Sequence, residues 1–98
     1  MSVDEPPEFE VRLRSKRVQR ELDSLQQVDY QRVVAKLKSL STDPRPQGSE
    51  KLFDNIYRVR IGDIRIVYLI DESKKLIDVG AIRRRSEHTY RRIEDLFR

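Results

Sequence analysis

Arginine dominates the residues of this chain that could do chemistry. Fifteen of the 21 basic residues are Arg, whose planar guanidinium binds phosphate in a bidentate fork and stacks on bases. Residues 1–55 contain 10 basic and 10 acidic residues, whereas residues 56–98 contain 11 basic and 7 acidic residues, so the net charge of +4 lies wholly in the C-terminal part. A one-sided, Arg-rich excess favours a polyanionic partner such as nucleic acid, although an acidic protein would be attracted to it as well.

The composition argues against several other classes of chemistry. The chain has no Cys and a single His, so neither a disulfide framework nor a Cys- or His-based metal site is expected. We therefore predict no metal and no small-molecule cofactor. No apolar run approaches the roughly 20 residues of a membrane span, and acidic residues precede the first basic one, unlike a secretory signal. A cytoplasmic protein is the resulting expectation.

The most informative segment is YRVRIGDIRIVY, residues 57–68. Its Gly62-Asp63 pair separates two alternating runs and predicts a two-residue type II′ turn. Such a turn sets the strand register and places Arg60 directly opposite Arg65, with Arg58 diagonally across. Side chains alternate between the faces of a sheet, so these arginines share one face with Val67 and Leu69. The predicted core face holds Tyr57, Val59, Ile61, Ile64, Ile66, Tyr68 and Ile70.

A second basic cluster begins where the last predicted strand ends. It consists of Arg83, Arg84 and Arg85, and Tyr90 and Arg91 follow it. The alternation of the preceding strand is interrupted at Gly80, which indicates a bulge. Periodicity therefore leaves open which of the three arginines faces the same way as Arg65. Tyr90 has two open readings: a core residue, or a ring on which a base stacks.

The elements that would position these residues form a single domain, residues 1–98, in which residues 1–7 are a loose leader. We expect a strand at 8–14, a helix capped by Ser15, a second helix capped by Asp29, a loop at 41–51, strands at 56–61, 64–70 and 75–82, and a final helix capped by Ser86. The order β-α-α-β-β-β-α predicts an α+β fold. Its sheet is four-stranded and mainly antiparallel, with a helical hairpin on one face and a C-terminal helix.

This element order, the hairpin at 57–68 and the segment RRRSEHTY at 83–90 together resemble the RelE/ParE toxin superfamily, as do Asp43-Pro-Arg-Pro and Lys51-Leu52. The resemblance extends from about Phe9 to Tyr90. It implies the RelE-like branch of type II toxin–antitoxin systems, whose members are ribosome-dependent mRNA interferases that inhibit translation. The implied partners are a cognate antitoxin, the ribosome and mRNA, in a bacterial or archaeal cytoplasm. The alternatives are a non-enzymatic, ParE-like gyrase inhibitor and a degenerate module that binds only antitoxin or RNA.

The resemblance also implies roles for individual residues. Arg65 would hold the scissile phosphate, Arg58 stands where RelE toxins often have Lys, Arg83 would support the leaving group, and Tyr90 would stack on a base. These four are the predicted catalytic residues. The predicted RNA-binding residues are Arg60, Arg84, Arg85 and Arg91. The spacing from Arg83 to Tyr90 is one residue longer than in the family pattern, so Arg84 and Arg85 remain alternatives to Arg83.

The general base is left open by the sequence. Cleavage by the 2′-hydroxyl would give a 2′,3′-cyclic phosphate (or 3′-phosphate) and a 5′-hydroxyl without a metal, and the step needs a proton acceptor. Arginine is poorly suited, because its pKa exceeds about 12. Arg58 in an unusual site, Glu50, Glu87, His88 and a ribosomal group are the candidates.

Overall fold

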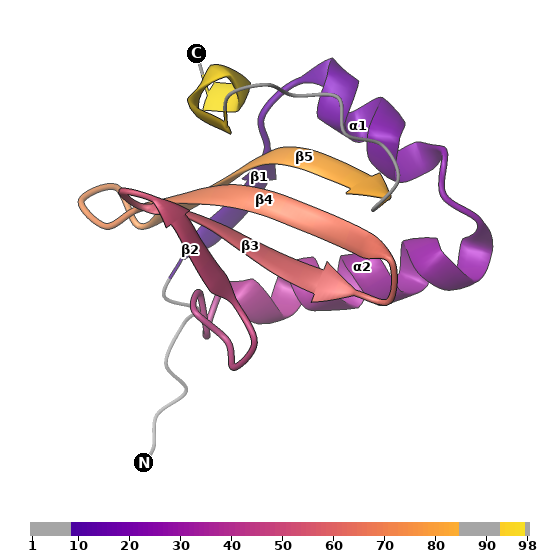
Figure 1. Cartoon of the computed structure of the whole chain (residues 1–98), viewed down its shortest axis with the longest axis horizontal. Coiled ribbons are helices and arrows are strands. Elements are labelled where there is room, and N and C mark those ends of the chain that lie inside the picture. The colour runs from indigo at the N-terminus through magenta and orange to yellow at the C-terminus, as the bar shows by residue number, and fades with distance from the viewer. Residues whose placement is uncertain (1–8, 85–92, 98) are drawn as a thin grey trace.

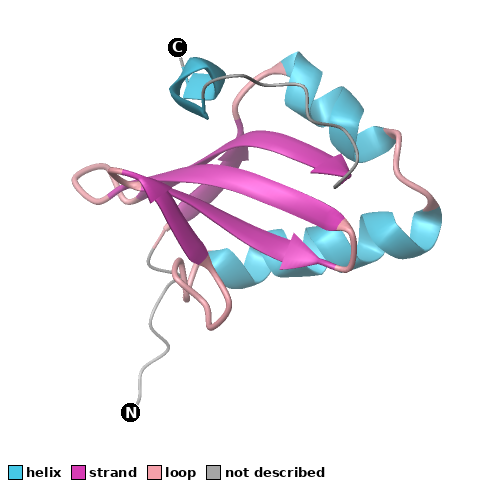
Figure 2. Ribbon diagram, in the orientation of Figure 1, coloured by secondary structure: helices cyan, strands magenta, loops and turns pink. Residues whose placement is uncertain are grey.

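The computed structural model describes residues 9–84 and 93–97, which form two α-helices, five strands and a terminal 3-10 helix. The elements are β1 (Glu10–Leu13), α1 (Lys16–Asp23), α2 (Gln27–Leu40), β2 (Glu50–Phe53), β3 (Ile56–Ile61), β4 (Ile64–Asp71), β5 (Leu76–Arg84) and η1 (Ile93–Phe97). The strands form one sheet in the order β1-β5-β4-β3-β2 (Figure 1). β1 is parallel to β5 and the other pairs are antiparallel, so the sheet is mixed, with both helices following its first strand (Figure 2).

The α+β fold is confirmed, but the predicted count of four strands is wrong. The additional strand, β2, pairs with β3 in a segment whose first residues were expected to belong to a loop. The loop-forming residues Pro44, Pro46 and Gly48 break regular structure only as far as Ser49, because strand pairing begins at Glu50. At the other end, residues 93–97 form a 3-10 helix instead of α-helix. The remainder of the predicted final helix, with its Ser86 cap, lies outside the described residues.

The first helix begins as predicted and the second does not. The Ser15 hydroxyl accepts a hydrogen bond from the Val18 N–H at 3.4 Å, which satisfies a donor at the start of α1. Helix α2 starts at Gln27, after Gln26, so Asp29 is not its cap. Asp29 instead lies in the first turn, where a carboxylate is favoured by the helix dipole.

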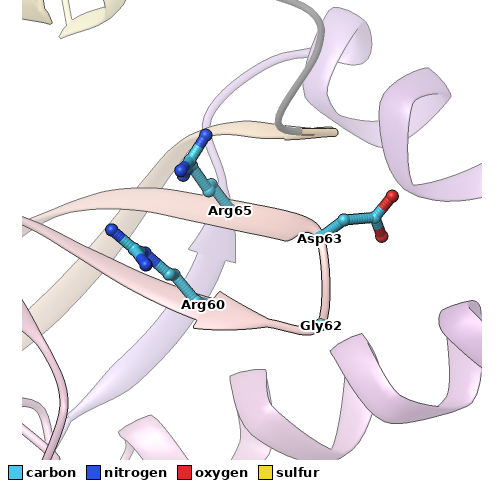
Figure 3. A pocket seen from close by; sticks show the side chains of 4 residues that line it. All are labelled: Arg60, Gly62, Asp63 and Arg65. Atoms are coloured by element: carbon cyan, nitrogen blue, oxygen red, sulfur yellow. The ribbon is translucent and has the colours of Figure 1, made fainter.

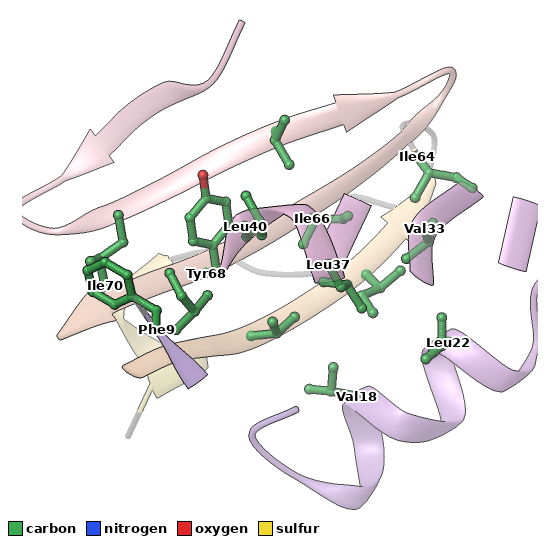
Figure 4. Packing of buried hydrophobic residues seen from close by; sticks show 14 residues of the cluster. Phe9, Val18, Leu22, Val33, Leu37, Leu40, Ile64, Ile66, Tyr68 and Ile70 are labelled. Carbon is green, nitrogen blue, oxygen red and sulfur yellow. The ribbon is translucent and has the colours of Figure 1, made fainter. Parts of the chain in front are cut away.

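The core lies between the two helices and the face of the sheet predicted to be buried (Figure 4). Tyr68 is fully buried there, and its hydroxyl donates a hydrogen bond to the Pro44 carbonyl at 2.7 Å. The hairpin register predicted from the turn is observed, with Arg60 opposite Arg65, and Gly62 has a φ of +61°, as the first central residue of a type II′ turn requires. The buried cluster comprises Phe9, Val18, Leu22, Val33, Leu37, Leu40, Val59, Ile64, Ile66, Tyr68, Ile70, Ile77, Val79 and Ile82.

The predicted bulge at Gly80 is confirmed. Val67 pairs with Ala81, but the next residue of β4, Tyr68, pairs with Val79, so Gly80 is an additional residue in β5. The bulge resets the alternation of the strand, because an extra residue reverses the direction of every side chain that follows. As a result Ile82 enters the core and Arg83 stands opposite Arg65.

The opposite face of the sheet carries a smaller apolar cluster beneath the C-terminal 3-10 helix. Ile56, Val67, Ala81 and Leu96 are buried in it. A Cβ added to Gly80 would lie 2.6 Å from Cζ of Phe97, so the ring occupies the space that a side chain on Gly80 would fill. The absence of a side chain at position 80 thus allows η1 to pack on the sheet.

We expect Gly80→Ala to destabilise the protein by about 1–3 kcal/mol, the usual cost of overpacking, and to release the C-terminal turn. The measurement is thermal unfolding together with the rate of limited proteolysis near residue 97. Adding Phe97→Ala should remove most of the effect of Gly80→Ala, because the two side chains then no longer collide. Equal destabilisation in both backgrounds would contradict this explanation.

Candidate nucleic-acid interface

Three arginines form a row across neighbouring strands on the sheet face opposite the core. Arg60 on β3 is opposite Arg65 on β4, and Arg65 is opposite Arg83 on β5. Neighbouring strands lie about 4.8 Å apart, so this arginine row spans about 10 Å. Arg58 lies two residues before Arg60 on the same face. Like charges directly opposite one another in a sheet are destabilising, so negatively charged groups beside this row would stabilise it.

A pocket of about 130 Å³ lies beside the central part of the row, lined by Arg60, Gly62, Asp63 and Arg65. Figure 3 shows Arg60 and Arg65 extending to the same side of the hairpin, while Asp63 points in the other direction. Arg60 is exposed and makes no hydrogen bond or ion pair with any residue in the described ranges. Its guanidinium is therefore available to a bound anion.

On the β2 side of the arginine row, Glu50 neutralises the charge of Arg58. Its carboxylate forms an ion pair with Arg58 across the β2–β3 pair. The hydrogen bond from Arg58, and then the positive charges of Arg58, Arg60 and Arg65, hold the pKa of the Glu50 carboxyl below its usual value. Within the described part of the chain, the buried Nε of Arg58 has no hydrogen-bond partner. At neutral pH the Glu50 carboxylate is therefore charged and forms an ion pair with Arg58. The buried Nε–H of Arg58 can still donate to another acceptor.

We expect Glu50→Gln to strengthen binding of single-stranded RNA and to steepen its dependence on salt. Because the pKa of Glu50 is lowered, the carboxylate is charged at neutral pH and competes with phosphate for Arg58. Freeing the Arg58 guanidinium for one phosphate contact should make the slope of log Kobs against log salt more negative by about 0.7. Fluorescence anisotropy with a 2′-O-methyl RNA over a salt series measures this slope, and an unchanged slope would show that Arg58 contacts no phosphate.

The α1 end of the row is held by Glu21, a residue that was not predicted from the sequence. Its Oε2 accepts from Nε of Arg83 at 2.8 Å and from Arg17 at 3.0 Å. Both Glu21 and Arg83 are largely shielded from solvent, with side chains 18% and 14% exposed. No spacing in the sequence signals this contact, because it depends on how α1 packs against β5.

The structure brings together four of the predicted site residues: Arg58, Arg60, Arg65 and Arg83. It does not bring Arg84 to the same face. Arg84 pairs with Ile64 of the core face and forms ion pairs with Asp29 at 2.9 Å and Asp63 at 3.0 Å. Of the three arginines at 83–85, Arg83 therefore joins the row. Arg85, Glu87, His88, Tyr90 and Arg91 lie outside the described residues.

The arrangement is suited to holding and stabilising negative charge. Its guanidinium groups could hold a phosphate and stabilise the charge that increases on a phosphate in a pentacovalent state. Glu50 is a weak proton acceptor because its pKa is lowered, and an efficient general base has a pKa near the working pH. Among the residues that the structure describes, no group of three His, Cys, Asp or Glu side chains could hold a metal ion, and no helix is long and apolar enough to cross a membrane.

Comparison of the fold with solved structures gives significant matches to structures of RelE toxins. The RelE–RelB complex of Pyrococcus horikoshii OT3 matches with a TM-score of 0.70 and 24% identity, covering 82% of this chain and 98% of that chain. The RelBE2 complex of Mycobacterium tuberculosis matches with a TM-score of 0.68 and 22% identity, covering 79% and 98%. The isolated E. coli RelE toxin matches with a TM-score of 0.70 and 15% identity, covering 83% and 88%.

These structures share the fold of this chain. The comparison with curated proteins gives no significant match. At the level of the sequence, residues 13–89 match the family model described as the ParE toxin of the type II toxin–antitoxin system parDE. This match spans most of the chain, including the hairpin that carries Arg58, Arg60 and Arg65. The chain therefore belongs to the ParE toxin family of type II toxin–antitoxin systems, within the RelE/ParE superfamily.

Proposed function

We propose that this toxin is a metal-independent endoribonuclease that cuts mRNA on the ribosome and so inhibits translation. The observation that carries the proposal is the arginine row with its pocket between Arg60 and Arg65. A row of guanidinium groups on an open sheet face fits an extended polyanion better than a compact ligand. The antitoxin-bound RelE structures support the further proposal that a cognate antitoxin covers this protein in the cytoplasm of its bacterial or archaeal host.

In the proposed reaction the nucleophile is a 2′-hydroxyl of the RNA, which attacks the adjacent phosphate. The 2′-oxygen loses its proton to a base and forms a bond to phosphorus, and the bond from phosphorus to the 5′-oxygen breaks. The departing 5′-oxygen takes up a proton, which leaves a 2′,3′-cyclic phosphate and a 5′-hydroxyl. Arg65 and Arg60 stabilise the charge on the phosphoryl oxygens, and Arg83 supports the leaving oxygen. We propose Glu87, His88 or a ribosomal group as the base, because the lowered pKa of Glu50 makes its carboxylate a weaker proton acceptor.

The deciding experiment is primer-extension mapping of mRNA after induction of the chain, with Arg65→Ala as the control. We expect breaks within translated regions, ending in a cyclic or 3′-phosphate, and none with the variant. Purified ribosomes programmed with a defined message should reproduce the breaks.

A second candidate is a non-enzymatic inhibitor of DNA gyrase, which the match to the ParE family model favours. It predicts intact mRNA together with loss of supercoiling after induction. Plasmid topoisomers from the same cultures distinguish the two functions in one experiment.

Tyr90 is proposed to act through its ring. A base stacked on an aromatic side chain contributes about 1–3 kcal/mol, most of which a Phe ring retains. We expect Tyr90→Phe to keep substantial cleavage activity and Tyr90→Ala to lose most of it, as measured by the rate of cleavage on programmed ribosomes. Equal loss in both variants would assign the role to the hydroxyl, and thermal unfolding of Tyr90→Ala controls for a structural role of the ring.

A further inference from the structure

The outer edge of β5 is completed by side chains of α1 where β1 ends. β1 pairs with β5 only from Leu76 to Val79, and beyond Val79 none of the strands that the structure describes pairs with β5 on that side. There, Arg17 of α1 donates to the Gly80 carbonyl at 2.9 Å, and the Ile82 N–H donates to Oε1 of Glu21 at 3.0 Å. Two side chains of α1 thus satisfy backbone groups of β5 that a neighbouring strand would otherwise bind.

The same carboxylate also determines the placement of a member of the arginine row. While Oε1 of Glu21 accepts from Ile82, Oε2 accepts from Nε of Arg83 at 2.8 Å. Both side chains are mostly shielded from water, and a charge-assisted hydrogen bond is stronger in such surroundings. Since the guanidinium is planar, fixing Nε fixes the plane of the whole group.

Arg83 stands directly opposite Arg65, which carries a like charge. Like charges on facing residues repel each other, and the Glu21 carboxylate offsets this repulsion by accepting from Nε of Arg83. The second contact on Oε2, from Arg17 at 3.0 Å, holds the carboxylate from the helix side. Glu21 is therefore bound on both sides, between its own helix and the strand that carries Arg83.

We propose that Glu21 is a positioning residue that orients Arg83 in the arginine row and so couples the docking of α1 to assembly of the RNA-cleaving site. The role in cleavage rests on the proposed function. The orientation of Arg83 does not, and it has a readout of its own in the Nε–H resonance of this side chain. Glu21 would contact neither the RNA nor the reacting atoms.

The test compares Glu21→Gln with Asp23→Asn, which makes the same change of charge on the same helix. Asp23 is exposed, and its carboxylate accepts a hydrogen bond from Gln19 at 3.0 Å. We expect the Arg83 Nε–H resonance to exchange slowly with water in the wild type and Asp23→Asn, and to be lost in Glu21→Gln. The rate of cleavage should fall about tenfold to a hundredfold in Glu21→Gln with little change in KM, as for a misplaced group.

A double-mutant cycle separates positioning from general stability. In an Arg83→Ala background, Glu21→Gln should cause no further loss of cleavage, because the group it orients is absent. Arg83→Lys keeps the positive charge but lacks the Nε–H that Glu21 binds, and we expect it to lose activity to a similar extent. Because this variant leaves Glu21 unchanged, it tests the contact even if Glu21→Gln folds poorly.

Four results would overturn the inference: a protected Arg83 resonance in Glu21→Gln, an equal loss in the Arg83→Ala background, wild-type cleavage by Arg83→Lys, or an equal loss in Asp23→Asn. A wild-type protein that cuts no mRNA would instead overturn the proposed function. The resonance of Arg83 would still decide the role of Glu21 in that case.

Discussion

Arg65→Ala is expected to lower the rate of mRNA cleavage by about 10²–10³ while the protein stays folded, in line with the loss of one group that stabilises transition-state charge. Arg65 is the central member of the arginine row, with Arg60 on one side and Arg83 on the other. It also lines the pocket beside the turn. No other residue of the row has cationic neighbours on both sides, so its loss interrupts the positive surface in the middle.

Retention of the fold follows from the face on which Arg65 lies. The side chain is outside the core cluster, and its removal relieves repulsion with the facing arginines. Circular dichroism and thermal unfolding should therefore match the wild type. Arg20→Ala removes the same charge from an exposed position on α1 and should cleave normally. Loss of activity accompanied by unfolding, or an equal loss in Arg20→Ala, would exclude the proposed role for Arg65.

Tyr68→Ala is expected to destabilise the fold by about 3–5 kcal/mol, the usual cost of removing a fully buried aromatic side chain. Tyr68 is 0% exposed, stacks with Tyr57 at a ring separation of 6.2 Å, and anchors the loop after α2 through Pro44. Removing the side chain opens a cavity in the core beside β4, the middle strand of the sheet. It also removes the hydrogen bond that holds the loop after α2. Chemical denaturation at neutral pH measures the effect.

Tyr68→Phe isolates the hydroxyl and gives a matched control. We expect a loss of about 1 kcal/mol at neutral pH, since one hydrogen bond disappears while the ring remains. Burial raises the pKa of Tyr68, so the wild-type hydroxyl contributes stability below its unfolded pKa of about 10 and loses it progressively as the pH rises beyond that value. The difference between wild type and Tyr68→Phe should therefore shrink above pH 10, and a constant difference would contradict the assigned burial.

The hairpin was predictable because its information is local. The Gly62-Asp63 turn sets the register, and alternation assigns each side chain to a face, so Arg60 and Arg65 could be paired from the sequence alone. The bulge at Gly80 was also indicated by an interrupted alternation. In contrast, β2 was missed because an edge strand of four residues, with Phe53 52% exposed, has no alternation of buried and exposed side chains to identify it.

The members of the site that come from distant segments were not predictable in the same way. Sixty-two residues separate Glu21 from Arg83, and their contact follows from the side of β5 that α1 covers. The direction of Arg83 required the bulge to be placed within β5, which fixed its partner as Arg65. Glu50 is among the candidate bases predicted from the sequence, but its ion pair with Arg58 depends on β2, the strand that was not predicted.

The parallel pairing of β1 with β5 has a consequence for the order in which the molecule is made. During translation β1 emerges first, yet its partner Leu76 follows Glu10 by 66 residues, and contacts so distant along the chain form late. The helices and the β3–β4 hairpin are synthesised earlier and rely on local interactions. Arg83 belongs to the same late strand, so the arginine row cannot be complete before β5 has left the ribosome. While it is still being synthesised, the chain therefore lacks the complete arginine row that the proposed cleavage requires.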